Sequence, residues 1–314
     1  MVTTDKSSEL MRRLWFLLGA LIVFRLGSHV PVPGIDLALY EKNFGGGGFL
    51  DLINMFSGGS LSRFSVFAMG IMPYISASII IQIAGEIFPS LKELKKEGEQ
   101  GKRKLTKYTR YLTVVIGLFQ GGFLAANVYN PNAASGMILV SQFEFYAVAM
   151  TCLLTGTLFL MWLGEQITER GLGNGISILI CAGIASSLPA SFSKMLSLVE
   201  NGDWSAVSVP LVLIGITALT AVVVFFERAL RKIPIQYANR TVGNRVYKGE
   251  STHLPLKLNI AGVIPPIFAS SILLLPAMVA GFLGVRFTWM KPIATILQHG
   301  QPLYVALFAA AVIF

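Results

Sequence analysis

Few residues in this 314-residue chain have the types and spacing that catalysis requires. The sequence contains no nucleophile elbow, HExxH helix or P-loop. The glycine string Gly171-Leu-Gly173-Asn-Gly175 is similar to a phosphate-binding loop, but an apolar run follows at once and no strand precedes it, so we expect a turn. Cys152 and Cys181 lie inside apolar runs without zinc-site spacing. The sequence therefore predicts a protein that is not an enzyme and that uses no cofactor or metal.

The residues with functional potential lie in long apolar stretches. Arg25 interrupts the first of these, where a charge is costly to insert, and we expect its side chain to cap carbonyl groups or to reach toward water. Ile71, Ile75 and Ile267 lie near prolines in two other runs. Each of them alone is typical of a packing or lipid-facing residue. A ring of such side chains, however, can close a pore by dewetting, without selecting among solutes.

Composition places these residues in a membrane protein. Charged residues make up 13% of the chain and hydrophobic residues 54%, whereas a soluble domain has about 25% charged residues. Seven runs are candidates for membrane-spanning helices, which need about 20 mainly apolar residues. The runs are 14–30, 66–88, 111–128, 145–163, 176–188, 209–226 and 258–283. An eighth run begins near Leu303 and reaches Phe314 before it could cross a bilayer, so we expect the chain to be part of a longer protein.

Loop charge predicts the orientation of the chain. With the N-terminus in the cytoplasm, the inside segments carry 19 of the 25 Lys and Arg residues, as the positive-inside rule requires. Most of this charge lies in two predicted loops, 89–110 and 227–257. Basic loops usually serve topology or bind anionic lipid. Apolar and basic residues alternate in 227–257, which predicts a hairpin that can also dock on phosphate backbones or an acidic protein face.

Two segments are similar in sequence and are predicted to cross the membrane in opposite directions. Residues 70–80 align without gaps on residues 262–272, with six of eleven positions identical. Inverted repeats usually place a shared pathway at their pseudo-two-fold axis, lined by interrupted helices, and we expect Pro73 and Pro265 to interrupt these two. Two unrelated apolar helices are the simpler interpretation. A secondary transporter is the alternative function, although the runs hold almost no buried acids or histidines for an ion site.

The segment before the second run is too short to span a membrane. Glycines at 45–48 and 58–59 flank the amphipathic stretch 49–57. This stretch would either fold back into a pore mouth as a mobile helix or lie flat on the membrane surface. The sequence leaves both possibilities open.

Seven motifs, in order along essentially the whole chain, resemble the SecY family of channel subunits of the Sec protein translocase. They are Arg25 with PVPG at 31–34, NMFSGG at 54–59, GIMPYISAS at 70–78, MWLGEQITERG at 161–171, GNGIS at 173–177, STHLPLK at 251–257 and GQPLY at 300–304. The resemblance implies an all-α polytopic membrane protein, an inverted-repeat helical bundle of ten spans, of which about seven and a half are present. The N-terminal half would be 1–188, with a plug near 49–63, and the C-terminal half 209–314.

The resemblance further implies a pore that translocates unfolded polypeptides and releases membrane proteins laterally. Its apolar pore ring would consist of Ile71, Ile75, Ile176, Ile180 and Ile267, with a sixth member beyond Phe314. Its plug would include Asn54, Met55, Phe56, Ser57, Gly58, Gly59, Ser60, Leu61, Ser62 and Arg63. The second and seventh spans would line a lateral gate, with Gln82 and Asn259 as buried polar contacts.

Partners are implied in the same way. They are the SecE and SecG subunits, the SecA motor ATPase, the ribosome through rRNA contacts, signal sequences and nascent polypeptides, and anionic lipids. Docking of SecA and the ribosome would involve Lys102, Arg103, Lys104, Arg240 and Arg245. Asn244 stands where the family often has a second arginine, and this would weaken the contact. The implied location is the bacterial cytoplasmic (inner) membrane.

Overall fold

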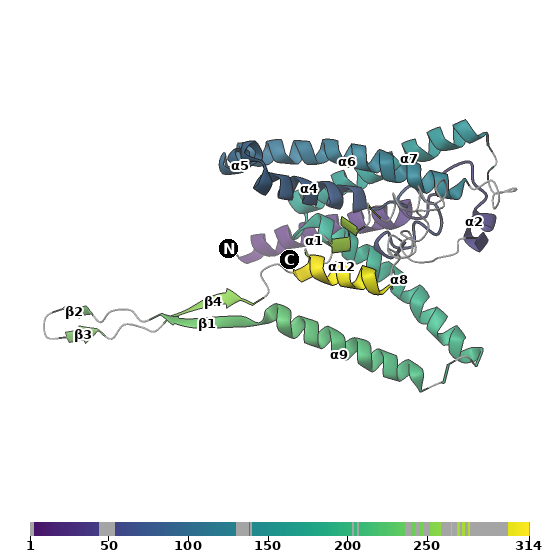
Figure 1. Cartoon of the computed structure of the whole chain (residues 1–314). Coiled ribbons are helices and arrows are strands. Elements are labelled where there is room, and N and C mark those ends of the chain that lie inside the picture. Colours follow the sequence, from purple (N-terminus) through teal and green to yellow (C-terminus); the bar gives the residue numbers. More distant parts are fainter. Residues whose placement is uncertain are drawn as a thin grey trace. The chain divides into compact units, whose positions relative to one another are not determined.

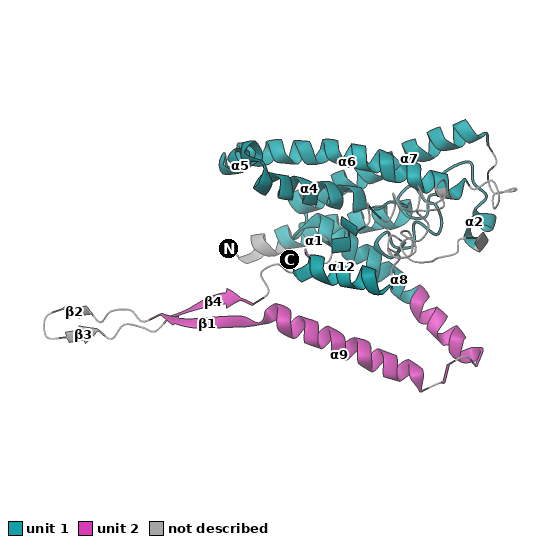
Figure 2. Cartoon of the chain, in the orientation of Figure 1, with its two compact units in different colours: residues 1–189, 268–314 teal, residues 190–267 magenta. Residues whose placement is uncertain are grey.

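The structure is a computed structural model in which helices dominate (Figure 1). It describes residues 3–43, 54–129, 138, 140–202, 204–205, 207–235, 240–242, 245–247, 252–258, parts of 265–276, and 301–313. The elements are α1 (Thr3–Gly27), α2 (Leu37–Asn43), α4 (Met72–Ile87), α5 (Pro89–Lys96), α6 (Glu99–Val128), α7 (Gln142–Arg170), α8 (Gly175–Glu200), α9 (Ser208–Arg228), β1 (Leu230–Ile235), β2 (Arg240–Val242), β3 (Arg245–Tyr247), β4 (Thr252–Lys257) and α12 (Pro302–Ile313). Two compact units divide the chain, residues 1–189 with 268–314 (unit 1) and residues 190–267 (unit 2), as Figure 2 shows.

Four helices in the described part of the chain, α6 to α9, are long and apolar enough to cross a membrane. They contain the predicted spans 111–128, 145–163, 176–188 and 209–226, which are thereby confirmed as helices. α8 is 26 residues long, so its flanks supply the length that the apolar run 176–188 lacks. The first predicted span lies mostly in α1, and most of the seventh lies outside the described residues.

The second predicted span differs from the structure at its beginning. Residues 66–71 form turns, and the helix starts only at Met72. Gly70 has φ +57°, a left-handed conformation that glycine adopts without strain, and it ends the turns. Pro73 lies in the first turn of α4, where a missing N–H costs no helical hydrogen bond. The prediction that Pro73 interrupts a helix is therefore wrong, because the proline starts one.

The basic segment 89–110, predicted as a loop, is helical except at its turn. α5 follows α4 after a bend of 100°, and α6 begins at Glu99. The segment is polar and exposed, which made it look like a loop, but Pro89 favours a helix start and Lys, Glu and Leu are good helix formers.

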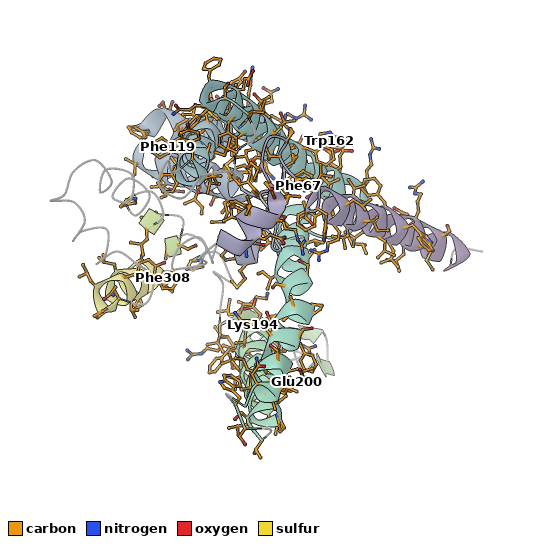
Figure 3. The ribbon with its side chains drawn as sticks, turned by 90° about the vertical axis from the view of Figure 1, so that its right-hand side faces the viewer. Phe67, Phe119, Trp162, Lys194, Glu200 and Phe308 are labelled. Carbon is orange, nitrogen blue, oxygen red and sulfur yellow. The ribbon has the colours of Figure 1, made fainter. Side chains whose placement is uncertain are left out.

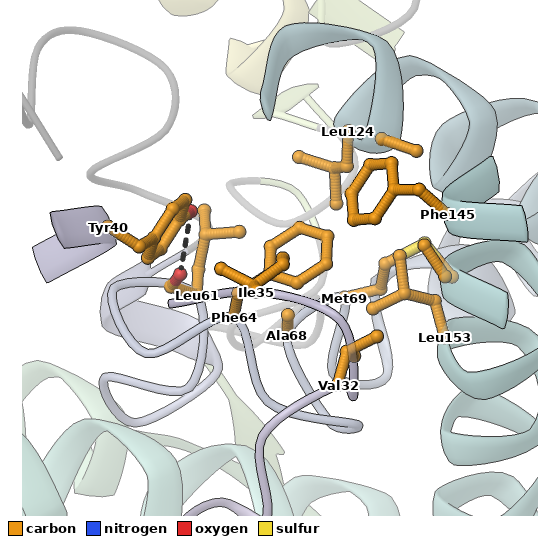
Figure 4. Packing of buried hydrophobic residues seen from close by; sticks show 12 residues of the cluster. Val32, Ile35, Tyr40, Leu61, Phe64, Ala68, Met69, Leu124, Phe145 and Leu153 are labelled. Atoms are coloured by element: carbon orange, nitrogen blue, oxygen red, sulfur yellow. Dashed lines mark hydrogen bonds between the residues drawn. The ribbon is translucent and has the colours of Figure 1, made fainter. Parts of the chain in front are cut away.

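The core of unit 1 forms where the turns after residue 60 pack against α6 and α7 (Figure 4). Phe64 is fully buried there, with its ring 5.5 Å from that of Tyr40 and 6.3 Å from that of Phe145. Farther along, Phe67 is also buried, whereas Phe119 and Trp162 lie on the outer surface of the helices (Figure 3). The non-helical segment is thus held in place by aromatic packing against membrane helices.

Unit 2 contains α9 and a pair of nested antiparallel ladders. β1 pairs with β4 from Leu230↔Lys257 to Ile235↔Thr252. Between them, β2 pairs with β3 through Arg240↔Tyr247 and Val242↔Arg245. The hairpin predicted for 227–257 is confirmed.

We expect Gly156→Ala to destabilise the protein by about 2 kcal/mol, since overpacking a tight contact has costs of this order. A Cβ atom at position 156 of α7 would overlap the carbonyl oxygen of Val66. Gly19→Ala on α1 is the matched control, because nothing lies within 4 Å of a Cβ there, and alanine is the better helix former. Thermal unfolding in detergent measures both variants. Equal melting temperatures would contradict the close packing of α7 on the turns.

Candidate functional site

Four of the five predicted pore-ring isoleucines lie at the ends of two helices in unit 1. Ile71 immediately precedes α4 and Ile75 lies one turn into it, while Ile176 and Ile180 lie near the start of α8. Ile71 is only 6% exposed, and Ile75 and Ile176 pack against the same apolar cluster. Ile267 lies outside the described residues.

Three of these side chains meet the predicted plug around one small cavity. Ile71, Ile75 and Ile180 line it together with Phe24 of α1 and Phe56 of the plug segment. The remaining lining residues are Gly70, Met72 and Leu179. The cavity has a volume of about 10 Å³, at the lower limit of the about 10–15 Å³ that one water molecule needs. Its lining side chains are apolar, so the isoleucines and the plug segment pack closely and leave space for at most about one water molecule.

The described part of the predicted plug, residues 54–63, is a compact series of turns. Asn54 begins a single helical turn, and its Oδ1 accepts a hydrogen bond from the backbone N–H of Ser62 at 3.0 Å. Ser57 is 1% exposed, and Phe56 lines the cavity beside the isoleucines. Burial of this end of the stretch 49–57 favours the folded-back alternative over one that lies flat on the membrane surface. Residues 49–53 lie outside the described part of the chain.

Side chains from two helices donate hydrogen bonds to carbonyl groups of this segment, and a third helix packs beside it. Arg25, in the last turn of α1, donates from Nη1 to the carbonyl oxygen of Gly58 at 3.2 Å. The Ser186 hydroxyl of α8 donates to the Gly183 carbonyl of its own helix at 2.7 Å, and its oxygen lies 3.4 Å from the Gly58 oxygen. Tyr40 of α2 donates to the carbonyl of Leu61 at 3.1 Å (Figure 4), and burial raises the pKa of this phenol, which keeps it protonated. The prediction that Arg25 caps a carbonyl is confirmed.

Two glycines permit the segment to approach α8 closely. Gly58 has φ +69°, and a Cβ there would lie 2.6 Å from the Ser186 Oγ. A Cβ at Gly183 of α8 would lie 2.5 Å from the carbonyl oxygen of Phe56. Backbone therefore packs against backbone at this point, and neither glycine can gain a side chain without displacing its neighbour.

The predicted lateral-gate contact Gln82 is exposed on α4, which contradicts the expectation of a buried amide. Its Nε2 donates to the Ser78 Oγ at 3.3 Å, one helical turn earlier. Gln82 lines a cavity of about 610 Å³ between α4, α5 and the first half of α6, with Ile81 and Leu105 as apolar lining. Asn259 lies outside the described residues.

The predicted docking residues occupy two separate elements. Lys102, Arg103 and Lys104 are exposed in the first turns of α6. Arg240 lies in β2, where it pairs with Tyr247, and Arg245 lies in β3, where it pairs with Val242.

Sequence reasoning missed three residues that contact the plug segment, Tyr40, Gly183 and Ser186. Small residues are common in apolar helices, so Gly183 and Ser186 give little signal by themselves. Their spacing of three, however, places both on one helix face, and small residues at this spacing often mark a close backbone approach. The glycine string 171–175 is a turn between α7 and α8, as expected, and the Asn174 Oδ1 caps α8 by accepting from the Ile176 N–H at 3.1 Å.

Comparison with known proteins supplies an independent line of evidence. The SecY family profile matches residues 65–314. The protein translocase subunit SecY of Escherichia coli K12 is 52% identical over 310 residues, which cover 98% of this chain and 70% of that protein. The corresponding subunit of Vibrio cholerae is 49% identical over 314 residues, again 70% of its length.

Solved structures agree at the level of the fold. A structure of a protein-conducting channel superposes with a TM-score of 0.61 at 17% identity, over 86% of this chain and 58% of that one. Sec61 in a canine ribosome–channel complex gives a TM-score of 0.59 at 18% identity, with the same coverage of both chains. This chain therefore spans somewhat more than half of the solved channels that it matches. Together, the profile, the 52% identity and the shared fold show that the chain belongs to the SecY family.

Proposed function

We propose that this chain is the pore-forming part of a protein-conducting channel, which translocates unfolded polypeptides and inserts membrane proteins laterally into the bacterial cytoplasmic membrane. The observation that carries the proposal is the cavity of about 10 Å³ where Ile71, Ile75 and Ile180 meet Phe56. A channel for unfolded chains must pass any side chain and still hold back ions. A deformable apolar constriction does both, because it excludes water when empty and offers no fixed charge to select among side chains.

The proposed channel has two exits. The pore ring, which we complete with Ile267, and the plug at 54–63 close the path across the membrane. The cavity beside Gln82 supports a lateral exit next to α4. Its lining contains both apolar and polar residues, which suit an amphipathic signal sequence. Asn259 would face it from the seventh span. The N-terminus lies in the cytoplasm, which places α5 and the start of α6 on the same side.

Partners supply the energy and the substrate in this proposal. SecE and SecG complete the membrane complex, and the SecA ATPase or a ribosome delivers signal sequences and nascent chains. The exposed cations Lys102, Arg103 and Lys104, with Arg240 and Arg245 on the hairpin, suit rRNA phosphates, acidic protein faces and anionic lipids. The relationship to Sec61, which was solved in a ribosome–channel complex, supports the ribosome as a partner.

Deletion of residues 48–62 from the complete protein is the direct test of a plugged channel. We expect single-channel recordings in planar bilayers, with the accessory subunits present, to show a quiet wild type and a leaky deletion variant, because the plug segment fills the space beside the isoleucines. Silence of both proteins, together with saturable uptake of a small solute into vesicles, would contradict the proposal and favour a secondary transporter.

Ile71→Asn should make channel openings about tenfold more frequent. The substitution removes part of the about 1.5–3 kcal/mol that burial of an isoleucine contributes, and about 1.4 kcal/mol corresponds to a factor of ten. Ile71→Leu is the matched control, since it keeps the apolar volume and should stay quiet. Ion conductance and the export of precursors with weakened signal sequences measure the effect. If the Asn and Leu variants seal equally well, Ile71 does not belong to the seal.

Arg245→Glu should weaken the binding of SecA or ribosomes by about tenfold, because a reversed charge repels phosphates and acidic surfaces. Lys194→Glu is the control, as this exposed lysine lies outside the proposed docking residues. Co-sedimentation of proteoliposomes with ribosomes, and SecA binding at low and high salt, provide the measurement. An equal loss in both variants would indicate a non-specific charge effect instead of a docking site.

A further inference from the structure

The carbonyl oxygen of Gly58 receives polar side chains from two different helices. Arg25 Nη1 of α1 lies 3.2 Å from it and Ser186 Oγ of α8 lies 3.4 Å from it. The two side chains are 161 positions apart in the sequence, yet they converge on one backbone atom of the plug segment. Arg25 donates to this oxygen, whereas the Ser186 hydroxyl donates to the Gly183 carbonyl of its own helix at 2.7 Å and packs beside the attachment point.

Arg25 is an unusual residue to find at this place. A charged side chain within a membrane span is costly and generally faces the protein interior, where it marks a functional element. The described residues place no carboxylate within ion-pair distance of Arg25. Its recorded side-chain bond goes to the plug carbonyl instead, and a hydrogen bond from a charged donor is stronger than one between neutral groups.

The backbone around this point is built for close contact. Gly58 adopts φ +69°, and Gly183 lies against the carbonyl of Phe56 without room for a Cβ atom. Phe56 in turn lines the cavity formed by the isoleucines. Phe56 of the apolar seal and Gly58 of the polar attachment are therefore separated only by Ser57.

We infer that Arg25 forms a latch on the Gly58 carbonyl, with Ser186 packed beside it, and that the strength of this latch sets how readily the channel opens. The latch rests on the channel function proposed above and assigns a positioning role to a residue outside the pore ring and the plug. It exists only while the plug segment is seated. A contact that exists only in the closed state stabilises that state relative to the open one by the full free energy of the contact. Weakening the latch therefore favours the open state and lets weaker signal sequences open the channel.

Arg25→Met tests the latch, because it removes the charge and all donors but keeps an unbranched side chain. We expect about tenfold more frequent openings in planar bilayers, and a comparable gain in the export of a precursor with a weakened signal sequence. Arg25→Lys should restore part of the closure, since an ammonium group also donates. Ser186→Ala should have a smaller effect in the same direction, because the Ser186 hydroxyl already donates to the Gly183 carbonyl at 2.7 Å and lies 3.4 Å from the Gly58 oxygen. Arg13→Met is the matched control on α1, where the exposed Arg13 pairs with Glu9 at 2.6 Å.

Gly183→Ala is a second, independent variant that leaves every donor in place. Its Cβ would lie 2.5 Å from the Phe56 carbonyl oxygen and push the plug segment away, so it should open the channel as Arg25→Met does. A variant that merely loses stability would export normal precursors less well. A latch variant should export normal precursors as wild type does and should export the precursor with the weakened signal sequence better. If deletion of residues 48–62 leaks but Arg25→Met and Gly183→Ala stay as tight as wild type, the latch is overturned and the channel function stands. If the deletion is silent as well, the channel function itself fails.

Discussion

A non-helical segment inside a bundle of membrane helices must satisfy its backbone polar groups without water, and this constraint shapes the whole of unit 1. Helices satisfy nearly all their own N–H and C=O groups, whereas a series of turns does so only in part. Within residues 57–71, backbone N–H groups bond to the carbonyls of Ser60, Leu61, Ser65 and Phe67. Arg25 and Tyr40 supply further donors, to the carbonyls of Gly58 and Leu61. α1 and α2 thus contact this segment through polar groups as well as by apolar packing.

The isoleucines around the small cavity and the hydrogen bonds to the plug segment use different chemistry because they have different roles. The isoleucines around the small cavity exclude water, but they hold nothing in a fixed orientation, since apolar contact is non-directional. The hydrogen bonds on Gly58 and Leu61 are directional, and they define where the plug segment sits. Phe64, fully buried between Tyr40 and Phe145, anchors the end of the segment. The segment is thus fixed at this end by apolar packing and a hydrogen bond together.

Hydropathy predicted the long helices well, because apolar length alone determines whether a segment can span a bilayer. It failed at residues 66–71, which are as apolar as a helix but carry Gly70 and precede Pro73, so the helix starts late. The hairpin in 227–257 followed from alternation of residue types, which is a local signal. The contacts of Arg25 with Gly58 and of Gly183 with Phe56 join distant positions, and no local pattern encodes them. Gln82 was expected to be buried from the family resemblance, and its exposure on α4 could not be predicted from the apolar run in which it lies.

The hydrogen bonds that other helices make to the plug segment, among the residues that the structure describes, come from one part of the chain. Arg25 and Tyr40 belong to the proposed N-terminal half, 1–188, whereas the ring is completed by Ile267 from the other half. Parting of the two halves would therefore widen the ring without breaking any of these hydrogen bonds. Opening then has two separate costs, one for parting the apolar ring and one for releasing the plug. In the proposed channel, a signal sequence that parts the halves meets the first cost and export of a chain also requires the second, so a weaker latch lowers the total that a weak signal sequence must overcome.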